Sequence, residues 1–79
     1  MAMYQDQTFL TQKPNTAFDA ELTPGASTPD SGIYRCMVCG WEIVSERNKP
    51  LPPQNHHTHA VGLGPITWRL IVFAQHKTP

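Results

Sequence analysis

Apolar residues are concentrated in three short segments of the chain from residue 33 onward. Ile33-Tyr34-Arg35 and Trp41-Glu42-Ile43-Val44 are rich in β-branched and aromatic residues, and turn-forming residues flank both segments. The third segment, residues 66–74, is the strongest strand pattern in the chain. No segment repeats its apolar residues every 3.6 positions over three helical turns. The pattern predicts a small all-β fold of about three short antiparallel strands, joined by long loops rich in proline and histidine.

The segment 66–74 carries apolar side chains on both faces of its predicted strand. Trp68, Leu70 and Val72 share one face, whereas Ile71 and Phe73 share the other. Because a strand that is apolar on both faces needs cover on both, we expect it to be central in the sheet or to pack against a partner. A homodimer is one such arrangement, since a second copy could cover Ile71 and Phe73.

The other segments suggest how the chain is divided. Residues 1–24 are polar with scattered apolar positions, so we expect an N-terminal arm that is flexible or pairs along the domain edge. Residues 23–32 are dense in turn formers and mark the start of the ordered domain. Three prolines between residues 50 and 53 exclude both a helix and a central strand there. We therefore predict an arm over 1–24, one domain over 25–76 and a tail over 77–79.

The composition provides few apolar residues for the hydrophobic core of this fold. The 79 residues give room for one domain, and a chain of this length buries only about 60% of its unfolded surface. Hydrophobic residues make up 39% of the chain, eight residues are proline, and the mean hydropathy is −0.39. We therefore expect a cross-link such as a bound metal, and we expect Trp41 and Trp68 to belong to the core.

The net charge of the chain and the sequence of its first residues indicate which partners and which cellular compartment to expect. Six basic and six acidic residues cancel and form no run, which disfavours nucleic acid as a partner. No stretch reaches the roughly 18 apolar residues of a membrane span, and the start lacks the basic and apolar regions of a signal peptide. We therefore expect a cytoplasmic protein with no membrane partner, whose thiols stay free or bind metal.

The two cysteines supply the first half of a predicted metal site. Cys36 and Cys39 are two residues apart, and Gly40 can adopt the positive φ at which such a turn ends. Three histidines follow within residues 56–59, and 16 residues separate Cys39 from His56. Two thiolates and two neutral imidazoles satisfy tetrahedral Zn²⁺.

Two pairs of histidines are candidates for the other two ligands. His56 with His59 repeats the spacing of the cysteines, and it is our first choice for the other two ligands. His57 with His59 is the alternative if the segment is extended, because alternate residues of a strand share a face. With either pair we expect one structural Zn²⁺, bound by Cys36, Cys39 and two of the histidines.

Other uses of these residues fit less well. A thioredoxin-type redox motif needs a βαβ framework, and attachment of c-type haem needs histidine at position 40. A DNA-reading finger needs about twelve residues between its ligand pairs and a helix that carries the histidines. The simplest alternative is that the cysteines are small buried side chains and the histidines are solvated.

A catalytic site is not expected. A catalytic zinc keeps an open position for water and a nearby carboxylate base, for which Glu42 or Glu46 is the candidate. Four protein ligands in two close pairs are more typical of a closed structural site. A chain this short also has little material for a pocket of several hundred Å³.

Residues 31–40, SGIYRCMVCG, followed by a proline-led second knuckle, resemble the zinc-ribbon superfamily. More narrowly, this motif with LPPQNHHTH over 51–59 and WRLIV over 68–72 is similar to short bacterial proteins of the protein L type, over residues 24–74. Gln54 stands where a third cysteine commonly follows the prolines of a ribbon, so the histidines would have to substitute. The resemblance implies a zinc-ribbon-like fold and no known activity.

Three functions follow as hypotheses. The first is an accessory module that uses structural zinc and contacts an unknown protein partner, with the homodimer as one form. The second is a nucleic-acid-binding zinc ribbon that uses Arg35, Lys49 and Arg69. The third is zinc sensing or storage, in which a spare His57 competes for the metal.

Overall fold

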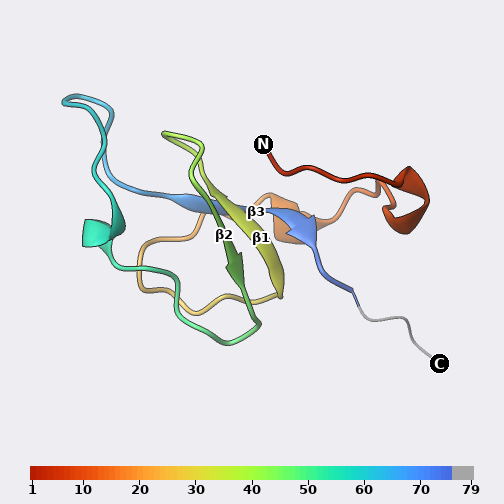
Figure 1. Ribbon diagram of the computed structural model, residues 1–79. Coiled ribbons are helices and arrows are strands. Elements are labelled where there is room, and N and C mark those ends of the chain that lie inside the picture. Colours follow the sequence, from red (N-terminus) through yellow and green to blue (C-terminus); the bar gives the residue numbers. More distant parts are fainter. Residues whose placement is uncertain (76–79) are drawn as a thin grey trace.

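Three antiparallel strands form one sheet in the computed structural model, which describes residues 1–75. They are β1 (Gly32–Cys36), β2 (Glu42–Ser45) and β3 (Trp68–Phe73), in the order β2-β1-β3 (Figure 1). Helical structure within these residues is confined to the 3₁₀ turns η1 (Gln7–Phe9), η2 (Thr16–Phe18) and η3 (Gln54–His56). The predicted small all-β fold is confirmed. The predicted tail over 77–79, and residue 76 at the predicted domain end, lie outside the described residues.

The central strand is β1, because the chain returns to it from both directions. β2 follows directly after the turn at residues 37–41 and pairs with β1 in the register Arg35 to Glu42. β3 arrives after the long loop that follows β2 and pairs with the other edge of β1, with Cys36 opposite Trp68. A register shift interrupts this second pairing between Ile33 and Tyr34. The last residue of β1 is therefore a buried cysteine that lies beside both the turn and the start of β3.

Of the two alternatives for residues 66–74, the central position is wrong, because β3 lies at the sheet edge. Its outer edge is paired at one point, where Leu22 and Trp68 exchange two backbone hydrogen bonds of 2.8 Å. The ring of Phe18 packs edge-on against Phe73, with 6.4 Å between their centroids. Cover for the apolar second face thus comes in part from the same chain, which the pattern of the strand alone could not reveal.

The segment 1–24 is tied to β3 by polar contacts as well. The Arg69 guanidinium donates two hydrogen bonds, of 3.1 and 2.9 Å, to the carbonyl oxygen of Phe18. The side chain of Asn15 accepts from the N–H of Ala17 and caps η2. These contacts hold η2 against β3, and Figure 1 shows the N-terminal segment passing beside that strand.

The core is small and lies around β1 and β3. Its buried members, none more than 3% exposed, are Tyr34, Cys36, Leu51, Ile66, Trp68 and Leu70. Trp68 joins this core as predicted, but Trp41 does not, because its side chain is 50% exposed. No helix among residues 1–75 is long and apolar enough to cross a membrane.

Replacing Leu70 by alanine should lower the free energy of unfolding by about 2–5 kcal/mol, since the side chain is 3% exposed and leaves a cavity. Val44→Ala is the matched control on β2, where the side chain is 81% exposed, and should change stability by about 0.5 kcal/mol or less. Urea unfolding followed by tryptophan fluorescence measures both. Equal losses in the two variants would contradict this description of the core.

Candidate metal centre

Cys36 is the last residue of β1, and Cys39 lies on the tight turn that connects β1 to β2. The N–H of Gly40 donates to the Cys36 carbonyl at 2.9 Å, and the N–H of Cys36 donates to the Trp41 carbonyl at 2.7 Å. Gly40 has φ of +82°, a left-handed conformation that side chains rarely adopt. The predicted positive φ at this position is confirmed. The turn directs both sulfur atoms to one side, where the histidine loop lies.

The histidines lie on the loop that follows the prolines. Leu51 anchors its beginning, because this residue is buried and its N–H donates to the Ala26 carbonyl at 2.8 Å. The 3₁₀ turn η3 ends at His56, and the next residue, His57, is extended, with φ −155° and ψ 165°. Alternate residues of an extended segment point to the same side. This conformation directs His57 and His59 together toward the cysteines.

Four side chains meet at this place and could hold a metal ion. One ligand atom from each of Cys36, Cys39, His57 and His59 lies within 4.8 Å of the others. The Cys36 Sγ is 3.3 Å from the His59 Nε2, and the Cys39 Sγ is 3.3 Å from the His57 Nε2. The two Nε2 atoms are 3.2 Å apart. Tetrahedral zinc with bonds of about 2.3 Å to sulfur and 2.0–2.1 Å to nitrogen requires separations of roughly 3.3–3.8 Å, and these three distances lie close to that range.

The structure brings together three of the four residues of the first-choice set, with His57 in the place of His56. The His56 Nδ1 lies instead 2.8 Å from the Nδ1 of His57, outside the group of four. The spacing of His56 and His59 would align them only if the helical turn continued. It ends at His56, and the alternate ligand, His57, takes the position facing Cys39.

The surroundings favour an ionised thiol at Cys36. Burial raises the pKa of this thiol, but hydrogen bonds from the backbone N–H groups of Cys39 and Val38 and from the His57 and Cys39 side chains outweigh it. The net effect lowers the pKa of Cys36 from 9.0 to about 6. A thiolate is the form that binds metal, so the turn prepares this ligand before any ion arrives.

A backbone carbonyl orients the ring of His59. The Nδ1 of His59 lies 2.8 Å from the Gly64 carbonyl oxygen and can only donate to it. The bond leaves Nε2 free to face the thiols, which is the tautomer that a ligand histidine needs. The same carbonyl raises the pKa of His59; burial has a smaller, opposite effect, and the Cys36 thiolate adds to the increase.

Two tryptophans contact the ring of His57. Trp41 stacks on it, with centroids 4.8 Å apart and planes inclined by 9°. Trp68 lies edge-on at 5.8 Å. The interpretation of Trp41 as core missed this contact with a candidate ligand, although its position directly after the C-x-x-C-G turn was a signal for it.

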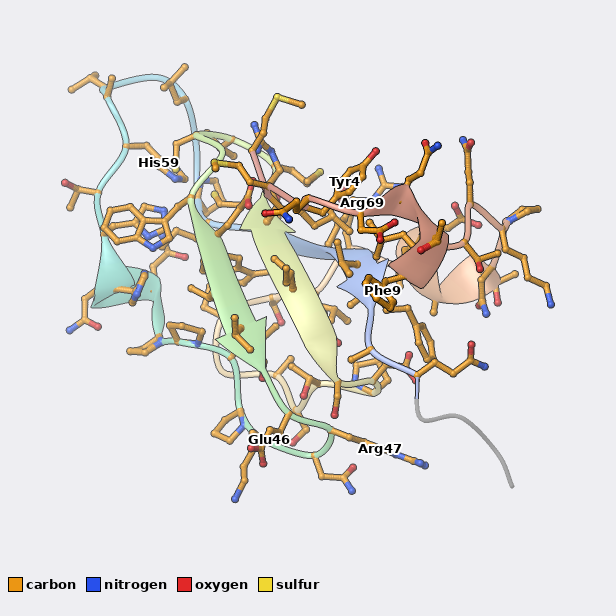
Figure 2. All side chains as sticks on the ribbon, turned by 45° about the vertical axis from the view of Figure 1, so that its right-hand side comes forward. Tyr4, Phe9, Glu46, Arg47, His59 and Arg69 are labelled. Carbon is orange, nitrogen blue, oxygen red and sulfur yellow. The ribbon has the colours of Figure 1, made fainter. Side chains whose placement is uncertain are left out.

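The candidate catalytic carboxylates lie elsewhere. Glu42 forms an ion pair of 2.6 Å with Arg35. Figure 2 shows Glu46 and Arg47 at one end of the molecule and His59 at the other. A hollow of about 820 Å³ lies between the N-terminal segment and β3, although we expected so short a chain to have little material for a pocket of several hundred Å³. Its walls include Phe9, Phe18 and Phe73 and none of the four cluster residues.

Comparison with known proteins gives one clear relative. No family model and no solved structure matches the chain. The chain is 49% identical over 76 residues to a protein of Escherichia coli called Protein L. The match covers 91% of this chain and 86% of that protein.

The geometry predicts which side chains hold metal. Cys36→Ser, Cys39→Ser, His57→Ala and His59→Ala should each lower the metal content of the purified protein, because each removes one of four donor atoms. His56→Ala should leave the metal-to-protein ratio unchanged. Elemental analysis of the five variants measures this. Loss of metal in His56→Ala with retention in His57→Ala would reverse the assignment of these two residues.

Proposed function

Because the chain belongs to the same family as Protein L of E. coli, and that name states no activity, we propose its function from the site itself: a small zinc protein whose single ion is structural. The observation that carries the proposal is the convergence of two sulfur and two imidazole nitrogen atoms within 4.8 Å. The fold around them is zinc-ribbon-like in having one ligand pair on a β-hairpin turn and the other on a loop.

The chemistry of the donors supports zinc as the metal. Thiolate sulfur with imidazole nitrogen in a tetrahedral set is typical of Zn²⁺, whereas oxygen ligands suit magnesium and calcium. Two thiolates cancel the charge of the ion. The closed site can therefore include the buried Cys36 without leaving a net charge in the interior.

The loop supports a structural role for the ion. Within the described residues, the backbone hydrogen bonds of residues 53–65 stay inside that segment, from His56 to Pro53 and from Leu63 to Ala60. The loop therefore has no ladder that fixes it to the sheet. The metal would connect it to the turn after β1 and supply the cross-link that the small core lacks.

The same geometry argues against a catalytic zinc. Four protein side chains would complete the tetrahedron of a bound ion and would leave no position for a water molecule. Glu42, one of the two candidate bases, is engaged by Arg35. Zinc sensing through a spare His57 also loses its basis, because His57 is one of the four.

Of the remaining hypotheses, contact with a protein partner has more support than contact with nucleic acid. Two of the three cations considered for nucleic acid are engaged within the chain, since Arg35 pairs with Glu42 and Arg69 bonds to the Phe18 carbonyl. Apolar side chains, by contrast, are exposed on the segments that carry the ligands: Val61 fully, Leu63 by 54% and Trp41 by 50%. We propose an accessory module that presents these loops to a protein, a second copy of the chain being one candidate.

Removing the ion should unfold the protein. Binding of structural zinc contributes on the order of 10 kcal/mol, whereas a domain of this size has about 5 kcal/mol of its own or less. Treatment with EDTA should therefore abolish the β-sheet circular dichroism signal, and added Zn²⁺ should restore it. Cys36→Ser should show the EDTA-treated spectrum without chelator. An unchanged spectrum and thermal midpoint after complete metal removal would contradict a structural role.

Acid should release the ion. The ligands bind only when deprotonated, and the depressed pKa of Cys36, about 6, keeps its thiolate available at neutral pH. In the metal-free folded chain the lowered pKa of Cys36 contributes stability that is fully present above the ordinary value of 9.0 and is lost as the pH falls through about 6. Zinc release measured with a chromophoric chelator should therefore rise as the pH falls, and it should begin below about pH 6 because bound Zn²⁺ competes with protons for the thiolate. Zinc release that does not depend on pH would argue against these ligands.

A further inference from the structure

We propose that His56 is a positioning residue that fixes His57 as a metal ligand by accepting a hydrogen bond from its Nδ1–H. This inference rests on the proposed zinc site and goes beyond it. His56 contributes no atom to the group of four, yet its Nδ1 lies 2.8 Å from the Nδ1 of His57. The contact joins two neighbouring residues whose rings are nearly perpendicular, at 80°.

The position of the proton follows from which nitrogen faces the cluster. The Nε2 of His57 lies 3.3 Å from the Cys39 sulfur and 3.2 Å from the Nε2 of His59. A neutral imidazole that binds metal through Nε2 carries its proton on Nδ1. The Nδ1 of His57 is therefore the donor in the short contact, and the Nδ1 of His56 is the acceptor. His56 must in turn carry its own proton on Nε2.

Aromatic contacts hold the acceptor in place. The ring of His56 lies edge-on to Trp41 at 5.2 Å and edge-on to the buried Trp68 at 6.0 Å. Its backbone N–H donates to the Pro53 carbonyl at 2.9 Å, which fixes the end of η3. A ring held on two sides presents its Nδ1 in one direction. The hydrogen bond to His57 therefore forms with little loss of conformational entropy.

The other candidate ligand histidine has the same arrangement with a different acceptor. The Nδ1 of His59 lies 2.8 Å from the Gly64 carbonyl oxygen, which can only accept. Each ligand ring thus has one acceptor at Nδ1 and presents Nε2 to the cluster. An outer partner of this kind fixes the ring and raises the basicity of the ligand nitrogen, and its loss typically costs 10–100-fold in metal affinity.

Two substitutions separate hydrogen bonding from packing. His56→Phe keeps an aromatic ring beside Trp41 and Trp68 but has no acceptor. His56→Asn places its Oδ1 near the position of Nδ1 and restores an acceptor without the ring. We expect His56→Phe to bind one Zn²⁺ per chain with an affinity lower by about 10–100-fold, and His56→Asn to recover most of the loss. Competition with a chelator of known zinc affinity measures both against the unsubstituted chain.

A spectroscopic measurement distinguishes a positioning residue from a ligand. With Co²⁺ in place of zinc, both His56 variants should keep the absorption bands of a tetrahedral site with two sulfur and two nitrogen ligands. The control, His57→Asn, should lose or shift them. A ligand-field spectrum altered in His56→Phe would identify His56 as a ligand and overturn the inference.

The remaining outcomes separate this inference from the zinc proposal. Zinc binding by the unsubstituted chain with equal affinity in His56→Phe, or no recovery in His56→Asn, overturns the role of His56 alone. An unsubstituted chain that binds no zinc removes both proposals. If a variant fails to fold, nitrogen NMR of the zinc-loaded natural chain decides: a proton on Nδ1 of His56, instead of Nε2, overturns the inference.

Discussion

The position of the loop that carries the histidines depends on side chains, because residues 53–65 make no backbone hydrogen bond to the sheet in the described part of the chain. Two sulfur atoms from the turn after β1 and two imidazole nitrogens from this loop provide the connection. The stacking of Trp41 on His57 lies directly beside that convergence. A bound ion would replace the weak contacts among these donor atoms by four coordinate bonds.

The size of the core explains why such a connection matters. Six apolar side chains are fully buried, and they belong to β1, β3 and the residues that flank the loop, Leu51 and Ile66. The N-terminal segment adds the Phe18 ring and the Leu22 bridge to the edge of β3. Both ends of the loop are thus anchored in the core, whereas its middle contacts the core through the rings of His56 and His57 on Trp68. A cross-link in the middle of the loop is what this arrangement lacks and what the proposed zinc supplies.

The site also shows how the family relationship and the chemistry complement each other. Similarity to Protein L places the chain among its relatives without stating an activity. The geometry of the cluster indicates metal binding but identifies no partner. The proposed role of holding exposed loops in a fixed shape rests on the site alone, since Val61 and Leu63 lie on the loop that the cluster would fix.

The sequence by itself determined the local features: the all-β fold, the turn with its positive φ at Gly40, and the two clusters of donor residues. These depend on residues close together in the chain, whose backbone preferences and spacing can be read directly. Only the tertiary structure decided that β3 is an edge strand, that Trp41 lies on a candidate ligand, and that His57, not His56, faces Cys39. The choice between adjacent histidines depends on where η3 ends, and a shift of one residue in that turn exchanges the ring that faces the thiols for the ring that supports it.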